Sequence, residues 1–216
     1  MDWEAHAERE EARYADGLGR LPDDPDGRQK QLVRVAMAAG GAGLARLLQS
    51  RKAEAAGWFA RAAERYRESY DGAPPGSWGR LIGALKSRIL AGDWSGAAED
   101  ARWALEQEPG ASDSPIGAYA GVLALLALAE DERAREAVAA LRSPEFPDAV
   151  ADSLAALSGH DREAYTEAVR RVLESFETRE EHLEDIQVAD TVIVLEALAA
   201  RRGLAAGLES PLLPSS

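Results

Sequence analysis

The fold is decided by one segment, Gly92-Asp93-Trp94-Ser95-Gly96-Ala97, which continues through Ala101, Ala104 and Leu105 to Pro109. Gly92 suits a tight turn, and the alanines that follow at helical spacing leave room for a neighbouring helix to pack closely. Pro109 cannot continue a helix and therefore ends the unit. The segment predicts the turn and second helix of a helical hairpin, a unit that stacks into binding scaffolds.

Proline is confined to five clusters, and the long stretches between them can each be helical throughout. Apolar residues in these stretches recur every three or four positions, as at Leu81, Leu85 and Ile89, which is the helical period. The β-branched run from Val188 to Val194 is the one rival strand, and Asp190 interrupts it. We predict an all-α fold of about ten helices, at residues 2–18, 28–48, 51–70, 77–90, 95–108, 116–129, 132–141, 146–157, 162–176 and 183–202.

Two later segments repeat the turn that precedes Ala97. One leads to Ala134 and the other to Ala164, so that the three alanines lie 37 and 30 residues apart. The pattern resembles the tetratricopeptide repeat, with an irregular period. We therefore expect degenerate αα-hairpins, stacked as a right-handed superhelix or as an irregular helical bundle. We expect residues 1–208 to form a single all-helical domain and residues 209–216 to form a proline-rich capping tail.

The charge balance limits the choice of partner. The chain carries 38 acidic and 25 basic residues, a net charge of −13. A phosphate backbone or an anionic membrane surface would repel such a chain, so we expect no nucleic-acid partner. An acidic surface also fits a salt-adapted organism, and the sequence leaves that alternative open.

Three features bear on the cellular compartment. Cysteine is absent, so the chain has no disulfide framework and no thiolate nucleophile. The first six residues are acidic where a signal peptide is basic. The longest apolar run, residues 118–129, is shorter than the roughly 20 residues that a membrane-spanning helix needs. These features predict a cytoplasmic protein that does not enter a membrane.

The three histidines give little support for a metal site. His182 and Asp185 are spaced so that they could share a helix face as ligands, which would suit an enzyme of unrecognised type. The acidic start of a helix is the interpretation that we favour for this segment, because the helix dipole stabilises acidic residues there. His160 lies in an expected turn, where a solvated or capping role is favoured. We predict no metal ion and no cofactor.

No catalytic signature is present either. Gly40, Gly41 and Gly43 do not follow a strand and no Gly-Lys-Ser/Thr motif follows them, which excludes a phosphate-binding loop. These glycines indicate close packing of another helix or a kink. The serines lack the Gly-x-Ser-x-Gly pattern of hydrolases. We therefore expect a protein that is not an enzyme.

Aromatic residues gather in the middle of the chain, between residues 58 and 103. Most of them are expected to belong to the core. The remainder could form an anchor for a partner on a concave face, because tryptophan and tyrosine dominate binding hot spots. The candidate partner-binding residues are Trp58, Tyr66, Tyr70, Trp78, Trp94 and Trp103.

The last part of the chain carries a second pattern. Asp190 is followed by Leu195-Glu196-Ala197-Leu198-Ala199-Ala200-Arg201-Arg202-Gly203 and then by Glu209-Ser210-Pro211-Leu212-Leu213-Pro214. This ending resembles that of the immunity protein 49 family. Members of that family are mostly helical and are expected to neutralise the cognate toxin of a polymorphic toxin system by binding it.

The resemblance implies a non-enzymatic immunity protein that binds a toxin. Acidic side chains would then steer a basic toxin towards the helical surface, which raises the rate of association. The alternative is a tetratricopeptide-like adaptor that binds a peptide or another protein in its concave groove. Neither the identity of the partner nor the oligomeric state follows from the sequence.

Overall fold

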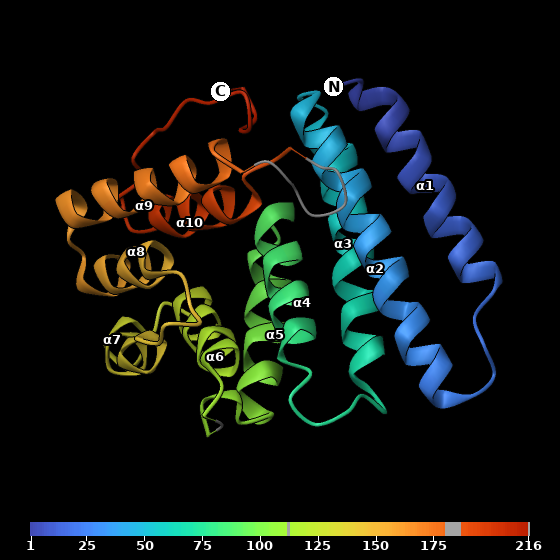
Figure 1. Ribbon diagram of the computed structural model, residues 1–216, viewed down its shortest axis with the longest axis horizontal. Helices are drawn as coiled ribbons and strands as arrows, with labels where there is room; N and C mark the ends of the chain where they lie inside the picture. Colours follow the sequence, from blue (N-terminus) through green and yellow to red (C-terminus); the bar gives the residue numbers. More distant parts are fainter. Residues whose placement is uncertain (112, 180–186, 216) are drawn as a thin grey trace. The chain divides into compact units, whose positions relative to one another are not determined.

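The computed structural model describes residues 1–111, 113–179 and 187–215, and this part of the chain is all-helical (Figure 1). It contains no strand, which confirms the predicted all-α class and the helical reading of the run before Val194. The helices of the first half are α1 (Trp3–Gly19), α2 (Pro25–Leu48), α3 (Lys52–Tyr70), α4 (Trp78–Ala91) and α5 (Trp94–Glu106). Those of the second half are α6 (Pro115–Ala127), α7 (Asp131–Ala137), α8 (Asp148–Gly159), α9 (Arg162–Glu177) and α10 (Asp190–Ala200). Two short 3-10 helices, η1 (Pro109–Ala111) and η2 (Val138–Leu141), complete the set.

The observed helices begin and end close to the predicted positions except at α10. Helix α10 was expected from residue 183 but begins at Asp190. Residues 183–186 lie outside the described part of the chain, and residues 187–189 are not helical. The reason is local: the Ala189 amide donates to the Leu212 carbonyl oxygen at 2.9 Å, so the backbone before α10 is paired with the tail.

The chain divides into two compact units. Unit 1 comprises residues 1–93 and 214–216, and unit 2 comprises residues 94–213. In unit 1 each helix packs on the next, from α1 to α4. In unit 2 the same holds from α5 to α9, and α10 packs on α8 and α9. That the units fold as the single domain expected from the sequence stays a prediction.

One type of turn recurs throughout the chain. A residue with left-handed backbone follows four of the helices, at Ser50, Gly92, Ala129 and His160. The next amide in each case donates to a carbonyl five residues earlier, at 2.9–3.0 Å, which is the Schellman motif. Each following helix, α3, α5, α7 or α9, begins two residues after the left-handed residue. The end of α10 has the same motif at Gly203.

The repeated turn corrects one detail of the sequence alignment. Five residues after the left-handed residue stands a side chain that is at most 1% exposed, and these side chains belong to Ala55, Ala97, Ala134 and Tyr165. The third copy was aligned on Ala164, which is exposed. Tyr165 takes the buried place because the left-handed residue of this turn is His160, whereas the alignment on Ala164 placed Gly159 there. The Gly92 turn lies at the boundary between the units, so the pairing of α4 with α5 stays a prediction.

Glycine allows a close approach inside unit 1, as the sequence predicted for residues 40–43. A Cβ atom added to Gly43 of α2 would lie only 2.6–3.0 Å from three ring carbons of Phe59 on α3. The Phe59 ring is itself 1% exposed. A Cβ atom at Gly40 would meet nothing within 4 Å. The absence of a side chain at Gly43 therefore allows the Phe59 ring of α3 to pack directly against α2.

Candidate partner-binding surface

The six predicted aromatic residues are all half-buried, so none is fully enclosed in the core and none is freely exposed. Trp58, Tyr66, Tyr70 and Trp78 belong to unit 1, whereas Trp94 and Trp103 belong to unit 2. The residues are therefore divided between two bodies, and we describe the surroundings of each within its own unit.

In unit 1, Trp58 is the best-defined member of this set. Its ring makes an edge-to-face contact with Tyr14 of α1, with ring centroids 5.3 Å apart and an angle of 83° between the planes. The Arg61 guanidinium lies 4.4 Å from the centre of the Trp58 ring, within the range of a cation–π interaction. The sequence pattern identified Trp58 but not its partner Tyr14, because Tyr14 is remote in the chain.

The other three candidate residues of unit 1 are Tyr66, Tyr70 and Trp78, and they differ in their surroundings. The Tyr66 ring lies against Gly83 of α4, where an added Cβ atom would meet ring carbons at 2.7–2.8 Å. Burial raises the pKa of the Tyr70 hydroxyl above its usual value, and the nearby Arg80 guanidinium opposes this effect. Trp78 is the first residue of α4.

In unit 2, helix α5 buries one side and exposes the other. The buried side consists of Ala97, Asp100, Ala101 and Ala104. The exposed side, which we call the α5 outer face, consists of Ser95, Glu99, Arg102 and Glu106, with half-buried Trp103 at its edge. Trp103 follows Glu99 by four residues and precedes Glu106 by three, so both carboxylates flank it on the helix surface.

The two carboxylates of the α5 outer face are available for a partner. Neither Glu99 nor Glu106 forms an ion pair or hydrogen bond with any residue that the structure describes. Trp94 lies on the opposite edge of α5, because nine residues correspond to two and a half helical turns. Its ring is covered by the Arg201 guanidinium at 4.3 Å. Trp103 rather than Trp94 therefore accompanies the exposed carboxylates.

The excess of acidic residues belongs entirely to unit 2. The residues of unit 1 include 14 acidic and 15 basic side chains, whereas those of unit 2 include 24 acidic and 10 basic side chains. Unit 1 is thus nearly neutral, and unit 2 alone accounts for the negative charge of the chain. A cationic protein would be attracted to the unit that carries the α5 outer face.

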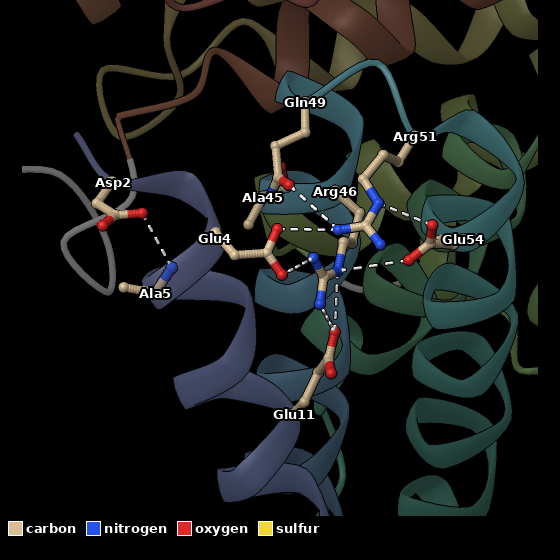
Figure 2. Close-up of polar contacts among 9 residues, drawn as sticks. All are labelled: Asp2, Glu4, Ala5, Glu11, Ala45, Arg46, Gln49, Arg51 and Glu54. Carbon is tan, nitrogen blue, oxygen red and sulfur yellow. Dashed lines mark hydrogen bonds and ion pairs between the residues drawn. The ribbon is translucent and has the colours of Figure 1, made fainter.

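A second polar cluster, in unit 1, has a structural role. Figure 2 shows Arg46 of α2 between two carboxylates of α1 and one of α3. Its guanidinium donates to Glu11 at 2.8 and 3.0 Å and to Glu4 at 2.7 Å, and Glu54 lies 3.8 Å away. Arg51 completes the network by donating to Glu4 at 2.9 Å and Glu54 at 2.7 Å. The Arg46 side chain is 7% exposed.

This network ties α1 to the turn between α2 and α3. The hydrogen bond that Arg46 donates to Glu4 holds the pKa of Glu4 below its usual value and raises the pKa of Arg46. Because the Arg46 donors point at carboxylates of the chain itself, they are already engaged. The sequence pattern missed the network, since its contacts to α1 join residues that lie 35 to 47 positions apart.

A third cluster connects the helix ends of unit 2. Asp131 accepts from Arg202 through both carboxylate oxygens and lies 2.7 Å from His160 Nε2. The Arg202 side chain is 4% exposed and also donates to the carbonyls of Leu126 and Leu198. Burial alone would raise the pKa of Asp131, but Arg202 and His160 together lower it. His160 ends α8 with left-handed backbone, which confirms its predicted capping role.

The remaining sequence interpretations are partly outside the described residues. His182 and Asp185, the weak metal candidates, belong to the segment 180–186 that the structure does not describe. Elsewhere, no three His, Asp or Glu side chains are grouped so that they could hold a metal ion. Among the described helices none is both long and apolar enough to cross a membrane.

Comparison with protein-family models, curated proteins and solved structures finds no match to the chain.

Proposed function

We propose that the protein is an immunity protein that binds a basic toxin and masks it, and that the α5 outer face contacts the toxin. The observation that carries this proposal is the pair of exposed, unpaired carboxylates beside Trp103 on the unit that holds the negative charge. The helical scaffold acts without chemistry of its own, since masking requires only a complementary surface.

Electrostatics supports a cationic partner. A surface with a large excess of one charge attracts the opposite charge over a distance set by salt, about 10 Å at 0.1 M ionic strength. Steering of this kind raises association rates by about ten- to a thousandfold. An inhibitor of a toxin benefits directly, because the toxin must be captured before it reaches its target.

Trp103 supplies the second part of the surface. Tryptophan residues at the centre of an interface, surrounded by polar residues that exclude water, contribute most of the binding energy in many complexes. Trp103 is half-buried, so its ring is already held in place before a partner arrives. The loss of side-chain freedom on binding is then small.

Co-expression with the product of the adjacent gene tests the proposal, because the resemblance to the immunity protein 49 family implies that this gene encodes the toxin. We expect the chain to restore growth of cells that produce the toxin and to co-elute with it as a one-to-one complex. A toxin that stays lethal and elutes alone, with the chain present and folded, would overturn the proposal.

Charge reversal then locates the surface. Glu99→Lys with Glu106→Lys should raise the dissociation constant by about ten- to a hundredfold, since two favourable contacts become repulsive. The matched control is Glu136→Lys with Glu174→Lys, which changes the charge of unit 2 equally at exposed residues of α7 and α9. We expect the control to change the constant less than about threefold. An equal increase of the dissociation constant in both variants would show that the net charge of unit 2 acts without a contact at α5.

The adaptor function is the second candidate. A segment outside the helices, residues 205–213, is held by hydrogen bonds to Glu196 of α10 and Glu177 of α9. A surface that accommodates a non-helical segment is what a peptide-binding adaptor requires.

A further inference from the structure

The end of unit 2 is a segment outside the helices, residues 205–213, that we call the strap. It leaves α10 after the turn at Gly203 and returns past α9 (Figure 1). Arg162, the first residue of α9, donates to the Gly203 carbonyl, and Ser210 donates to Glu177, the last residue of α9, at 2.7 Å. The strap therefore follows α9 from its start to its end.

The carboxylate of Glu196, on α10, binds the backbone of the strap. Its two carboxylate oxygens accept from the consecutive amides of Ala206 at 3.0 Å and Gly207 at 2.8 Å. Consecutive amides that point at one anion form a nest, which the left-handed backbone of Gly207 (φ 66°) makes possible. The Tyr165 hydroxyl donates to the same carboxylate at 2.7 Å and so fixes its orientation.

The anchor on the helix side is permanent. Tyr165 is fully buried, and both burial and the neighbouring Glu196 raise the pKa of its hydroxyl far above the usual range. The hydroxyl therefore remains a hydrogen-bond donor at any physiological pH. With the strap removed, Glu196 would still be oriented by Tyr165 and ready to accept two amides.

The strap itself is attached at the surface. None of its nine side chains is buried, and Leu208, Leu212 and Leu213 are only half-buried. Helix α10, in contrast, buries Val192, Val194, Leu195, Leu198 and Ala199. Most of the strap's hydrogen bonds to the helices involve its main chain, at Ala206, Gly207 and Leu212. Recognition of the main chain tolerates different side chains, and the left-handed position of Gly207 favours glycine.

We propose that the surface formed by α9, α10 and Glu196 is a peptide-binding surface, which the strap occupies within the chain and from which a peptide of a partner protein with the same backbone conformation displaces it. The peptide that fits has small residues at two consecutive positions, whose amides meet Glu196, followed by a leucine. This inference goes beyond the proposed toxin binding and does not depend on it.

A labelled peptide with the sequence of residues 205–213 tests the surface. Gly207→Pro in the full chain should release the strap, because proline has no amide hydrogen and cannot adopt a positive φ. The residues of the surface formed by α9, α10 and Glu196 are unchanged in this variant. The control is Glu209→Ala, at an exposed strap residue whose side chain forms no hydrogen bond or ion pair with any described residue.

We expect the Gly207→Pro chain to bind the peptide at least about tenfold more tightly than the control or the unsubstituted chain. The reason is that an intact strap competes at an effective concentration in the millimolar range, about that of a short flexible linker. A folded Gly207→Pro chain that binds the peptide no more tightly would overturn the proposal. Loss of the helical circular dichroism signal in that variant would overturn it too, because the strap would then be part of the core.

Hydrogen exchange of the unsubstituted chain gives an independent measurement. A detachable strap opens locally, so the amides of Ala206 and Gly207 should exchange at least about a hundredfold faster than those of Val169 and Val172 in α9. Equal protection at the four amides would mean that the strap opens only when unit 2 unfolds, and the proposal would be wrong.

Discussion

Replacement of Gly43 by alanine should destabilise the protein, whereas the same replacement at Gly40 should stabilise it. Both glycines are inside α2. Alanine is favoured over glycine in a helix interior by roughly 0.5–1 kcal/mol, which applies equally at both sites. The two sites differ in their surroundings: nothing lies within 4 Å of a Cβ atom at Gly40, but at Gly43 the Cβ atom would lie 2.6 Å from a ring carbon of Phe59.

The Phe59 ring cannot move away freely, because it is enclosed in the core of unit 1. Adding a methyl group to a packed core costs about 1–3 kcal/mol. After the helix preference is subtracted, Gly43→Ala should lower the free energy of unfolding by about 1 kcal/mol. Gly40→Ala should raise it by about 0.7 kcal/mol, so the two variants should differ by about 2 kcal/mol.

Urea unfolding followed by circular dichroism measures this difference through the midpoint of the transition, provided that the slope is unchanged. The double variant with Phe59→Leu provides a control, since a smaller side chain removes the clash. In the chain that carries Phe59→Leu, Gly43→Ala should lower the free energy of unfolding by less than it does in the parent chain. If Gly43→Ala is as stable as Gly40→Ala, the inferred close packing of Phe59 against Gly43 is wrong.

Three further predictions concern charge and backbone conformation. Because the folded-state pKa of Glu4 is lowered, its charge stabilises the protein fully above the ordinary pKa of 4.5, and that contribution is lost as the pH falls below it. Glu4→Gln should therefore be less stable than the parent in unfolding titrations at neutral pH and equally stable in strong acid; a constant difference would contradict this. Ala129→Gly should raise the free energy of unfolding by about 1 kcal/mol because of its positive φ, whereas Ala164→Gly within α9 should lower it by a similar amount. Arg202→Ala should cost about 3 kcal/mol, since it leaves a carboxylate without its main partner, whereas exposed Arg170→Ala should cost about 0.5 kcal/mol or less; similar thermal shifts in both would refute the role of the buried cluster.

Local signals made the helices predictable from sequence. Proline clusters and apolar spacing of three to four residues report directly on each helix, and Asp2, Asp24 and Asp161 cap helix starts as short acidic side chains usually do. The turns at Gly92, Ala129 and His160 were predicted because the segments around them resemble one another, although only Gly92 is itself a glycine. Ser50 adopts the same left-handed turn without any local signal, because its conformation is imposed by the packing of α2 and α3.

The candidate surface was less predictable because it depends on which side of a helix is buried. The sequence identified Trp103, but the exposure of Glu99 and Glu106 beside it follows from the burial of the other side of α5. The concentration of charge in one unit was likewise hidden, since the boundary between the units falls within a turn. Contacts such as that between Arg202 and Asp131 join residues far apart in the chain and leave no local pattern.

Titration of the product of the adjacent gene, which is the expected toxin, with the purified chain at about 0.05 M and about 0.5 M salt tests toxin binding most directly. We predict a one-to-one complex at both concentrations, with an association rate at least about tenfold lower at high salt, as expected for steering by the charge of unit 2. Absence of binding at both salt concentrations would contradict the proposed function.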